Sequence, residues 1–323
     1  MPLEAILLGT AQDGGVPQAG CSCAHCSRAR TDPAKRQWAA CLGLVDRASR
    51  QSWLIDATPD FRQQLHALQV FSGSSGQGPS DPSGYNPDCP LTGILLTHAH
   101  IGHYAGLIHL GREAWNTQEL PVYASVPMAD FLRRHAPWSQ LVALGNVTLQ
   151  PLTPGEALQL SPRLRVTPVS VPHRDELSDT LAFVVEGRRR RLFYCPDIDR
   201  WDAWEHDLRD FVGDMDVALL DGTFYGAVEL PGRDLDAIPH PLAPDTAGRL
   251  VGVDSDVRLI HLNHTNPLWR PGPEREWLAA TGLAVGAAGE RWRLDCGGIG
   301  CHPVGQGGFV VRPQRACAFG FPG

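Results

Sequence analysis

The chain has 323 residues, a formal net charge of −7 and 43% hydrophobic residues, enough to bury a large core. It has no long basic run of the kind that nucleic-acid binding needs, no apolar run of about 18 residues to span a membrane, and no secretory signal at its start. We therefore expect a cytoplasmic protein whose partner is a small molecule, with neither a membrane nor a nucleic acid as partner; homodimer formation stays open.

Short apolar segments alternate with helical patterns along the chain. The segment 72–90 is rich in Gly, Ser and Pro and predicts a mobile loop, which we interpret as an insertion rather than a lid. We predict helices at 59–69, 128–136 and 202–211, together with a helical start just after Gly102. We predict strands at 3–9, 41–46, 52–57, 92–97, 120–125, 163–173, 180–187, 191–197, 216–224 and 258–266.

This alternation predicts an α+β fold of two packed sheets with helices outside. We expect a single domain over residues 1–295. The Gly-rich segment 296–323 is expected to form a disordered tail. The basic run "GRRRR" at 187–191 falls between two predicted strands and is interpreted as a hairpin turn.

Three histidines, His98, His100 and His103, stand within six residues directly after a predicted strand, in "LTHAHIGHYAGL". In an extended stretch His98 and His100 point to the same side. Neutral imidazoles are good ligands for zinc, iron and manganese. A lone histidine would more often be an ordinary core or surface residue, but this spacing favours a metal site. Further candidate ligands stand near the ends of later strands: His173, Asp197 and His261.

A second cluster, "CSCAHC", contains Cys21, Cys23 and Cys26. Three thiolates at this spacing suit a closed tetrahedral zinc site that lacks one ligand. Three ordinary reduced cysteines are the alternative. His25 lies inside the cluster but is poorly placed to be the fourth ligand. The odd count of nine cysteines, without a secretion signal, favours thiols over a disulfide framework.

The histidine pattern resembles the metallo-β-lactamase superfamily, whose signature is His-x-His-x-Asp-His followed by a distant His, Asp and His. Here "HAHIGH", His173, Asp197 and His261 follow that order, and the resemblance extends over about residues 3–295. It implies an αββα sandwich. It also implies that His98, His100 and His173 hold a first metal, that Asp197 bridges, and that His103 and His261 hold a second.

Two branches of this superfamily are most similar. The coenzyme PQQ synthesis protein B family shares "LGTAQDGGVPQAGCSCAHC", "DGTF" and "HLNHTNP", although it commonly lacks the first two histidines of the signature. The phosphonate-pathway cyclic phosphodiesterase shares the cysteine cluster and completes it with a histidine three residues after its last active-site histidine. "HLNH" has this spacing, which assigns His261 to the active site and His264 to a structural zinc; the reverse assignment is the alternative. Residues three apart on a strand point to opposite faces, which would let one strand end serve both sites.

Gly102 replaces the aspartate of the signature, so the resemblance implies a second metal site without its own carboxylate. We expect tight binding of the first ion and weaker, exchangeable binding of the second. Asp13, in "QDGG", is typical of a turn residue; an approach to the vacancy at Gly102 is the alternative. Asp56 and Asp221, near strand ends, are either acceptors for ligand histidines or structural turn residues.

These features predict a metal-dependent hydrolase in which Asp197 and His103 take part in catalysis. An ion held by neutral histidines activates water for attack on a phosphodiester or related ester. A protein of the PQQ synthesis protein B type, either an oxidative enzyme or a carrier, is the alternative, and a non-enzymatic binding module is a third hypothesis. The expected cofactors are a structural zinc and one or two divalent ions of zinc, manganese or iron.

Overall fold

The computed structural model describes residues 1–72, 91–226, 229 and 239–296. The expected loop at 72–90 and the expected tail at 296–323 therefore lie outside the described residues, apart from Ser72 and Cys296. Within the described part, no helix is long and apolar enough to cross a membrane. Five described cysteines carry free thiols, whereas Cys296 is disulfide-bonded, so the expectation of thiols alone does not extend to it.

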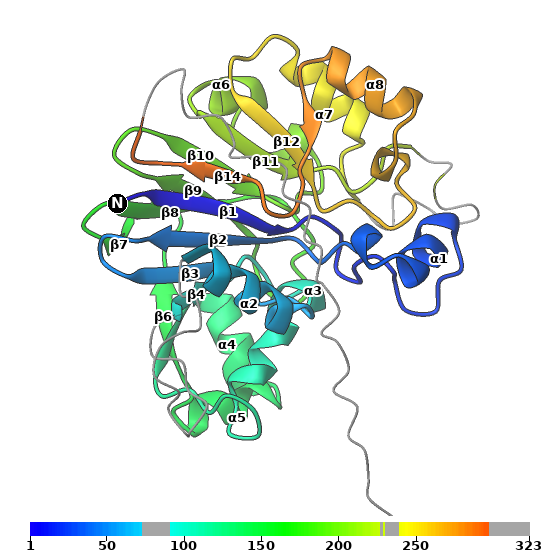
Figure 1. Cartoon of the computed structure of the whole chain (residues 1–323). Helices are drawn as coiled ribbons and strands as arrows, with labels where there is room; N and C mark the ends of the chain where they lie inside the picture. The colour runs from blue at the N-terminus through cyan, green and yellow to red at the C-terminus, as the bar shows by residue number, and fades with distance from the viewer. Residues whose placement is uncertain (73–90, 227–228, 230–238, 297–323) are drawn as a thin grey trace, which may run out of the picture.

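Two seven-stranded sheets pack face to face (Figure 1). The first has the order β14 (Arg291–Arg293), β1 (Leu3–Gly9), β2 (Cys41–Asp46), β3 (Gln51–Ile55), β4 (Leu91–Leu95), β5 (Leu120–Ser125) and β6 (Val147–Leu152). The second has the order β13 (Ala284–Val285), β12 (Asp256–Ile260), β11 (Val217–Asp221), β10 (Arg191–Cys195), β9 (Leu181–Glu186), β8 (Leu164–Ser170) and β7 (Leu158–Ser161).

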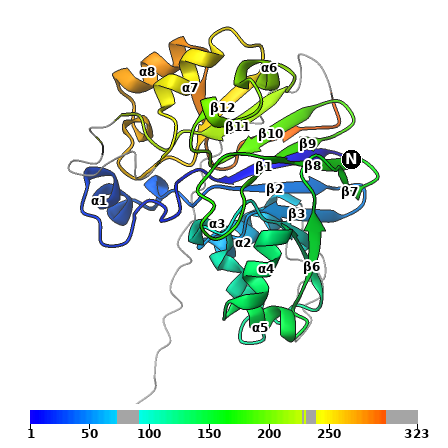
Figure 2. The ribbon, with the colours of Figure 1, turned by 180° about the vertical axis from the view of Figure 1, so that it is seen from behind.

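Helices cover the outer faces of both sheets, as the view from behind also shows (Figure 2). The first sheet packs against α2 (Phe61–Ser72), α3 (Ile101–Tyr104), the 3-10 turn Ala105–Leu110, α4 (Val126–Arg134) and α5 (Trp138–Ala143). The second packs against α6 (Leu208–Gly213), α7 (Ala243–Leu250) and α8 (Pro273–Ala280). The helix α1 (Ala24–Thr31) and the 3-10 turns Pro33–Lys35, Trp201–Ala203 and Pro267–Trp269 complete the described helical elements. The α+β sandwich predicted from the sequence is confirmed.

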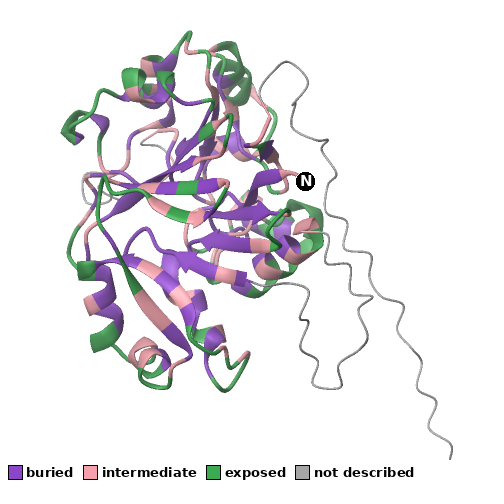
Figure 3. Cartoon of the chain, turned by 90° about the vertical axis from the view of Figure 1, so that its left-hand side faces the viewer, coloured by how far each residue is buried: buried purple, intermediate pink, exposed green. Residues whose placement is uncertain are grey.

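The core between the sheets is apolar and closed to solvent. Trp53, Phe183 and Tyr194 are among its largest side chains, each exposed by 1% or less. Strands that are buried on both faces have continuous apolar sequences, which is why β1, β2 and β11 are easy to recognise. Figure 3 shows this burial along the strands, with exposed residues mainly on the helices and loops.

Several predicted elements begin or end at other residues in the structure. The predicted helix at 202–211 is wrong over its first half, because α6 begins only at Leu208, where the Asp207 carboxylate accepts the backbone N–H of Asp210 at 3.0 Å. A side chain that caps a helix in this way marks its first turn, so the residues before Asp207 lie outside α6. The strand predicted to reach His173 ends at Ser170, and the strand predicted through His261 ends at Ile260.

Asp46 links the two sheets at the end of the sandwich remote from the histidines. Its buried carboxylate accepts the Ser161 hydroxyl at 2.7 Å and lies 3.0 Å from Arg163 Nη2. Burial alone would raise the pKa of Asp46, but these partners and the Ala48 N–H hold it below its usual value. The interaction therefore stabilises the fold at neutral pH.

We predict that Asp46→Asn lowers the free energy of unfolding at pH 7, and that the difference from wild type shrinks with acidity. The depressed pKa means that the contribution is present above the pKa of the unfolded carboxyl, about 3.9, and is lost as pH falls through the folded value. Urea unfolding at pH 7, 4, 3 and 2 measures it. A difference that stays constant over this range would contradict the assignment.

Candidate metal centre

The histidines and aspartates singled out from the sequence meet at one rim of the sandwich. Loops that follow β1, β3, β4, β8, β10 and β12 carry most of them there, and Asp221 is the last residue of β11. Parallel pairing of β3 with β4 and of β10 with β11 and β12 brings several strand ends to the same edge. The residues fall into three groups: an imidazole group, a carboxylate-rich group and the cysteine cluster.

The imidazole group consists of His98, His100 and His173, whose ligand atoms lie within 4.8 Å of one another. His100 Nδ1 lies 2.9 Å from His98 Nε2 and 3.1 Å from His173 Nε2. A tetrahedral ion with bonds of about 2.0–2.1 Å holds two ligand nitrogens about 3.3 Å apart. The three nitrogens therefore converge at close to the spacing that a divalent ion requires.

Hydrogen bonds fix which nitrogen of His98 faces the group. Thr97 Oγ1 lies 3.0 Å from both oxygens of Asp56 and 3.0 Å from His98 Nδ1. A carboxylate only accepts, so the hydroxyl donates to Asp56 and accepts the N–H of His98 Nδ1. The lone pair of His98 Nε2 is left facing inward, as metal binding needs. His173 is oriented in the same way, because its Nδ1 donates to Asp199 Oδ1 at 2.8 Å.

The carboxylate-rich group consists of Asp13, His103 and His261, with Asp197 beside them. Asp13 Oδ1 lies 3.3 Å from His103 Nε2 and 3.5 Å from His261 Nε2, and Asp197 Oδ2 lies 2.8 Å from His103 Nε2. These four atoms are all buried and none makes a hydrogen bond. Four orphaned polar atoms that converge on one point would be costly without a ligand, and their chemistry fits a divalent cation.

The outer nitrogens of this second group are also held. His103 Nδ1 donates to Asp56 Oδ2 at 2.7 Å, so Asp56 supports a ligand histidine directly. The Thr223 hydroxyl donates to Asp221 Oδ1 at 2.7 Å and lies 2.9 Å from His261 Nδ1, so Asp221 supports His261 only through this hydroxyl. Both arrangements leave an Nε2 lone pair facing Asp13 and Asp197.

The two groups differ in electrostatics. Burial lowers the pKa of His98, His100 and His173, which keeps these imidazoles neutral and able to bind a metal. For His103 burial acts in the same direction, but Asp56, Asp13 and Asp197 outweigh it and raise the pKa. The second group therefore needs a positive charge among its carboxylates, which a proton on His103 or a bound cation can provide.

One residue of the site, His240, was missed from the sequence. His240 Nδ1 lies 2.7 Å from Asp221 Oδ2 and 3.7 Å from Asp197 Oδ1, and its side chain is almost fully buried. Burial lowers the pKa of His240, but Asp221 and Asp197 raise it above its usual value. His240 follows no predicted strand and stands in a proline-rich segment, so no periodic signal pointed to it.

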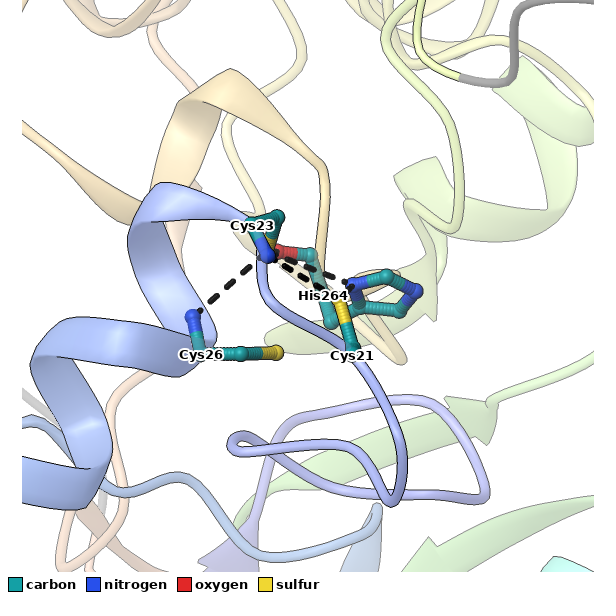
Figure 4. Close-up of side chains that lie close together, drawn as sticks. All are labelled: Cys21, Cys23, Cys26 and His264. Atoms are coloured by element: carbon teal, nitrogen blue, oxygen red, sulfur yellow. Dashed lines mark hydrogen bonds between the residues drawn. The ribbon is translucent and has the colours of Figure 1, made fainter.

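The cysteine cluster consists of Cys21, Cys23, Cys26 and His264 (Figure 4). His264 Nδ1 lies 3.3 Å from Cys21 Sγ and 3.6 Å from Cys23 Sγ. Burial and the neighbouring cysteines raise the pKa of Cys26 to about 12, so three thiolates need a cation to coexist. Three sulfurs and one imidazole nitrogen are a ligand set that suits tetrahedral zinc.

The structure places His264 with the cysteines and His261 with the other histidines, and the reverse assignment does not fit. The explanation expected from the sequence, that the two residues point to opposite faces of one strand, is wrong, however. His261 lies beyond β12 with a φ of 59°, so a turn rather than the two faces of a strand separates it from His264. His25 Nδ1 donates a hydrogen bond to the His264 carbonyl oxygen at 2.9 Å, and His25 is not a member of the cluster.

Two chain segments each contribute to both clusters. The loop after β1 carries Asp13 and the three cysteines, and the turn after β12 carries His261 and His264. The segments run side by side through a parallel bridge between Ala11 and Leu262, with Gln12 N donating to Leu262 O at 3.0 Å. An ion bound by the cysteine cluster would therefore also hold in place the two segments that carry Asp13 and His261.

Comparison with known proteins gives a consistent picture. Residues 52–263 match the family described as the beta-lactamase superfamily domain. The chain is 28% identical over 289 residues to coenzyme PQQ synthesis protein B of Methylobacterium sp. (strain 4-46), which covers 82% of this chain and 91% of that protein.

Solved structures resemble the whole described fold. The zinc-bound PqqB from Methylobacterium extorquens superposes with a TM-score of 0.71 at 25% identity, covering 89% of this chain and 99% of that one. A diphosphatase from the PhnP family superposes with a TM-score of 0.60 at 20% identity, covering 91% of this chain and 97% of that one, and this second likeness concerns the fold alone.

We predict that Cys23→Ser removes zinc from the cysteine cluster and weakens ion binding by the carboxylate-rich group by about tenfold, the lower range for loss of a supporting interaction. The imidazole group, carried by the loops after β4 and β8, should change less. Elemental analysis and manganese titration measure both effects. Ser22→Ala, an exposed position in the same loop, is the control. Loss of zinc with unchanged binding at Asp13, His103 and His261 would contradict the coupling.

Proposed function

This chain belongs to the beta-lactamase superfamily, and on that premise we propose that it is a metal-dependent hydrolase acting on a phosphodiester or related ester. The observation that carries the proposal is the convergence of buried ligand atoms from both groups beside Asp197, with four atoms of the carboxylate-rich group left without a hydrogen bond. Such a centre matches the needs of water activation better than those of a purely structural site, because the imidazole group offers only neutral ligands.

His98, His100 and His173 would hold one divalent ion, and His103, His261 and Asp197 would contribute to a second. When bound, such an ion lowers the pKa of water to about 7 and polarises a substrate oxygen. Asp197 is placed to serve both groups, since its Oδ2 lies 3.7 Å from His98 Nε2 and 2.8 Å from His103 Nε2. With ions bound, Asp197 would contribute to both sites and would orient the attacking water.

His240 is the residue positioned to handle a proton. Its hydrogen bond to Asp221 orients the ring through Nδ1, which leaves Nε2 as the atom that can give a proton to a departing oxygen. Its ring centre lies 5.4 Å from that of His173 and 5.9 Å from that of His261, so it faces both groups. In this assignment Asp197 would position the attacking water, and His240 would protonate the departing oxygen.

A cavity of about 370 Å³ adjoins the imidazole group, and Arg174 is the one arginine among the lining residues that the structure describes, which also include Asp175 and Asp179. His173, Arg174 and Asp199 are among its lining residues. Arg174 Nε is buried and makes no hydrogen bond within the described part of the chain. A guanidinium that is free to bind a ligand beside a metal centre favours phosphate oxygens, which it can contact through several N–H groups.

The second candidate is a role in cofactor synthesis. It is favoured by the similarity to coenzyme PQQ synthesis protein B over 82% of this chain. Iron in the purified protein, with no hydrolysis of phosphodiesters, would support this candidate. Zinc or manganese with phosphodiester hydrolysis would support the first.

We predict that His98→Ala abolishes hydrolysis of bis(4-nitrophenyl) phosphate and removes about one equivalent of active-site metal. The variant loses one of three converging nitrogens, and the remaining two cannot hold the ion in the same geometry. Steady-state kinetics and elemental analysis measure both changes. His206→Ala, in a loop of the second sheet, is the matched control. Unchanged turnover in His98→Ala would exclude the proposed mechanism.

We predict that Arg174→Gln raises KM for the anionic substrate by about tenfold or more, as expected for one charged hydrogen bond. KM for a neutral ester such as 4-nitrophenyl acetate should change little. Arg188→Gln, in the exposed turn after β9, is the control. Equal changes for the anionic and the neutral substrate would show that Arg174 does not select charge.

A further inference from the structure

Gly102 is where the resemblance to the superfamily leaves a carboxylate missing, and the structure shows what occupies that space. An added Cβ at Gly102 would lie 2.0 Å from Asp13 Oδ1 and 2.5 Å from Asp13 Cγ. The backbone of Gly102 lies in α3 and does not have a positive φ, so no backbone conformation demands glycine there. Glycine is therefore needed at position 102 because a side chain there would collide with the carboxylate of Asp13.

Asp13 arrives from a different part of the fold. It lies in the turn after β1, while Gly102 lies in the turn of helix after β4. Three backbone hydrogen bonds hold the turn: Gln12 N to Leu262 O at 3.0 Å, Gly15 N to Gln12 O at 2.8 Å, and Val16 N to Gln37 O at 2.8 Å. The turn role expected from "QDGG" is thus correct for the backbone, while the side chain enters the site.

The inner oxygen of Asp13 behaves as a ligand atom would. The side chain is 34% exposed as a whole, yet Oδ1 is buried and has no hydrogen bond. It points between His103 Nε2 and His261 Nε2, at 3.3 and 3.5 Å. The ion-pair partners of this oxygen are two imidazole nitrogens, so a salt bridge to lysine or arginine does not explain its position.

We propose that Asp13 supplies the carboxylate of the second metal site in place of a residue at position 102, so that the site consists of Asp13, His103, His261 and Asp197. This inference rests on the metal centre of the proposed function. It removes the reason for expecting a weak second site, because the site then has two carboxylates and two imidazoles. Gly102 and Asp13 form a reciprocal pair in which only one position can carry a side chain.

The test is manganese titration of protein whose histidine sites have been emptied by a chelator while elemental analysis confirms one retained zinc in the cysteine cluster, with free Mn²⁺ counted by electron paramagnetic resonance. Manganese suits carboxylate and imidazole ligands and leaves the thiolate cluster aside. Wild type should bind two ions tightly. Asp13→Asn, which preserves shape and removes the charge, should bind one ion as before and the second at least about tenfold more weakly. Thermal unfolding confirms that the variant is folded.

A double variant tests the reciprocal pairing. Gly102→Asp alone should be destabilised by contact with Asp13, and Asp13→Gly alone should lose the second ion. The double variant D13G/G102D should bind the second ion at least about tenfold more tightly than D13G/G102A, which fills the same space without a carboxylate.

An equal second-ion affinity in wild type and folded Asp13→Asn would overturn the proposal, and so would equal affinities in the two double variants. Neither result depends on hydrolysis. Failure of the proposed function is recognised separately, by two tightly bound ions in a wild-type protein that hydrolyses no ester.

Discussion

The buried carboxylate of Asp197 is the constraint around which the rim of the sandwich is organised. It is 2% exposed and has five imidazole rings within 4.0 Å, those of His98, His103, His173, His240 and His261. Burial alone would raise the pKa of Asp197, but the charges of His261 and His103 hold it well below its usual range. A buried anion is tolerated only with compensating positive charge. The surrounding histidines therefore have to come from both sheets, and the sandwich is what brings them together.

An outer layer of Asp and Thr residues gives those histidines their orientation. Asp56 with Thr97 serves the first sheet, and Asp221 with Thr223 serves the second. Asp56 and His261 both have left-handed backbones, with φ of 71° and 59°, directly after β3 and β12. Such conformations cost a non-glycine residue about 1–3 kcal/mol each. Each turns the chain sharply at a strand end, and the hydrogen bonds of Asp56 and of Thr223 with His261 hold these residues in place.

Much of this arrangement follows from the sequence, and the reasons for the rest are specific. Strands such as β1 and β2 are buried apolar runs and β5 alternates buried with half-buried residues, so their bounds could be predicted to the residue. The histidines after β4 carry their own spacing signal. His240 carries no such signal. A residue that follows a strand is expected to meet other strand ends at the sheet edge, whereas a residue in a proline-rich segment is not. The neighbours of Asp13 favoured a turn residue over an approach to Gly102, since local sequence reports backbone conformation but not what a side chain meets across the fold.

The position of Asp13 connects the two clusters in a way that a carboxylate at position 102 would not. A residue in α3 would be held by the same short segment as His100 and His103, independently of the cysteines. Asp13 instead belongs to the loop that leads to Cys21, and it faces His261 on the turn that leads to His264. The carboxylate-rich group thus depends on two loops that the cysteine cluster holds together, whereas the imidazole group depends on the loops after β4 and β8. Because the groups share Asp197 and the segment after β4, while only the carboxylate-rich group uses the loops that bear the cysteine cluster, their ion affinities can vary separately while the distance between them stays fixed.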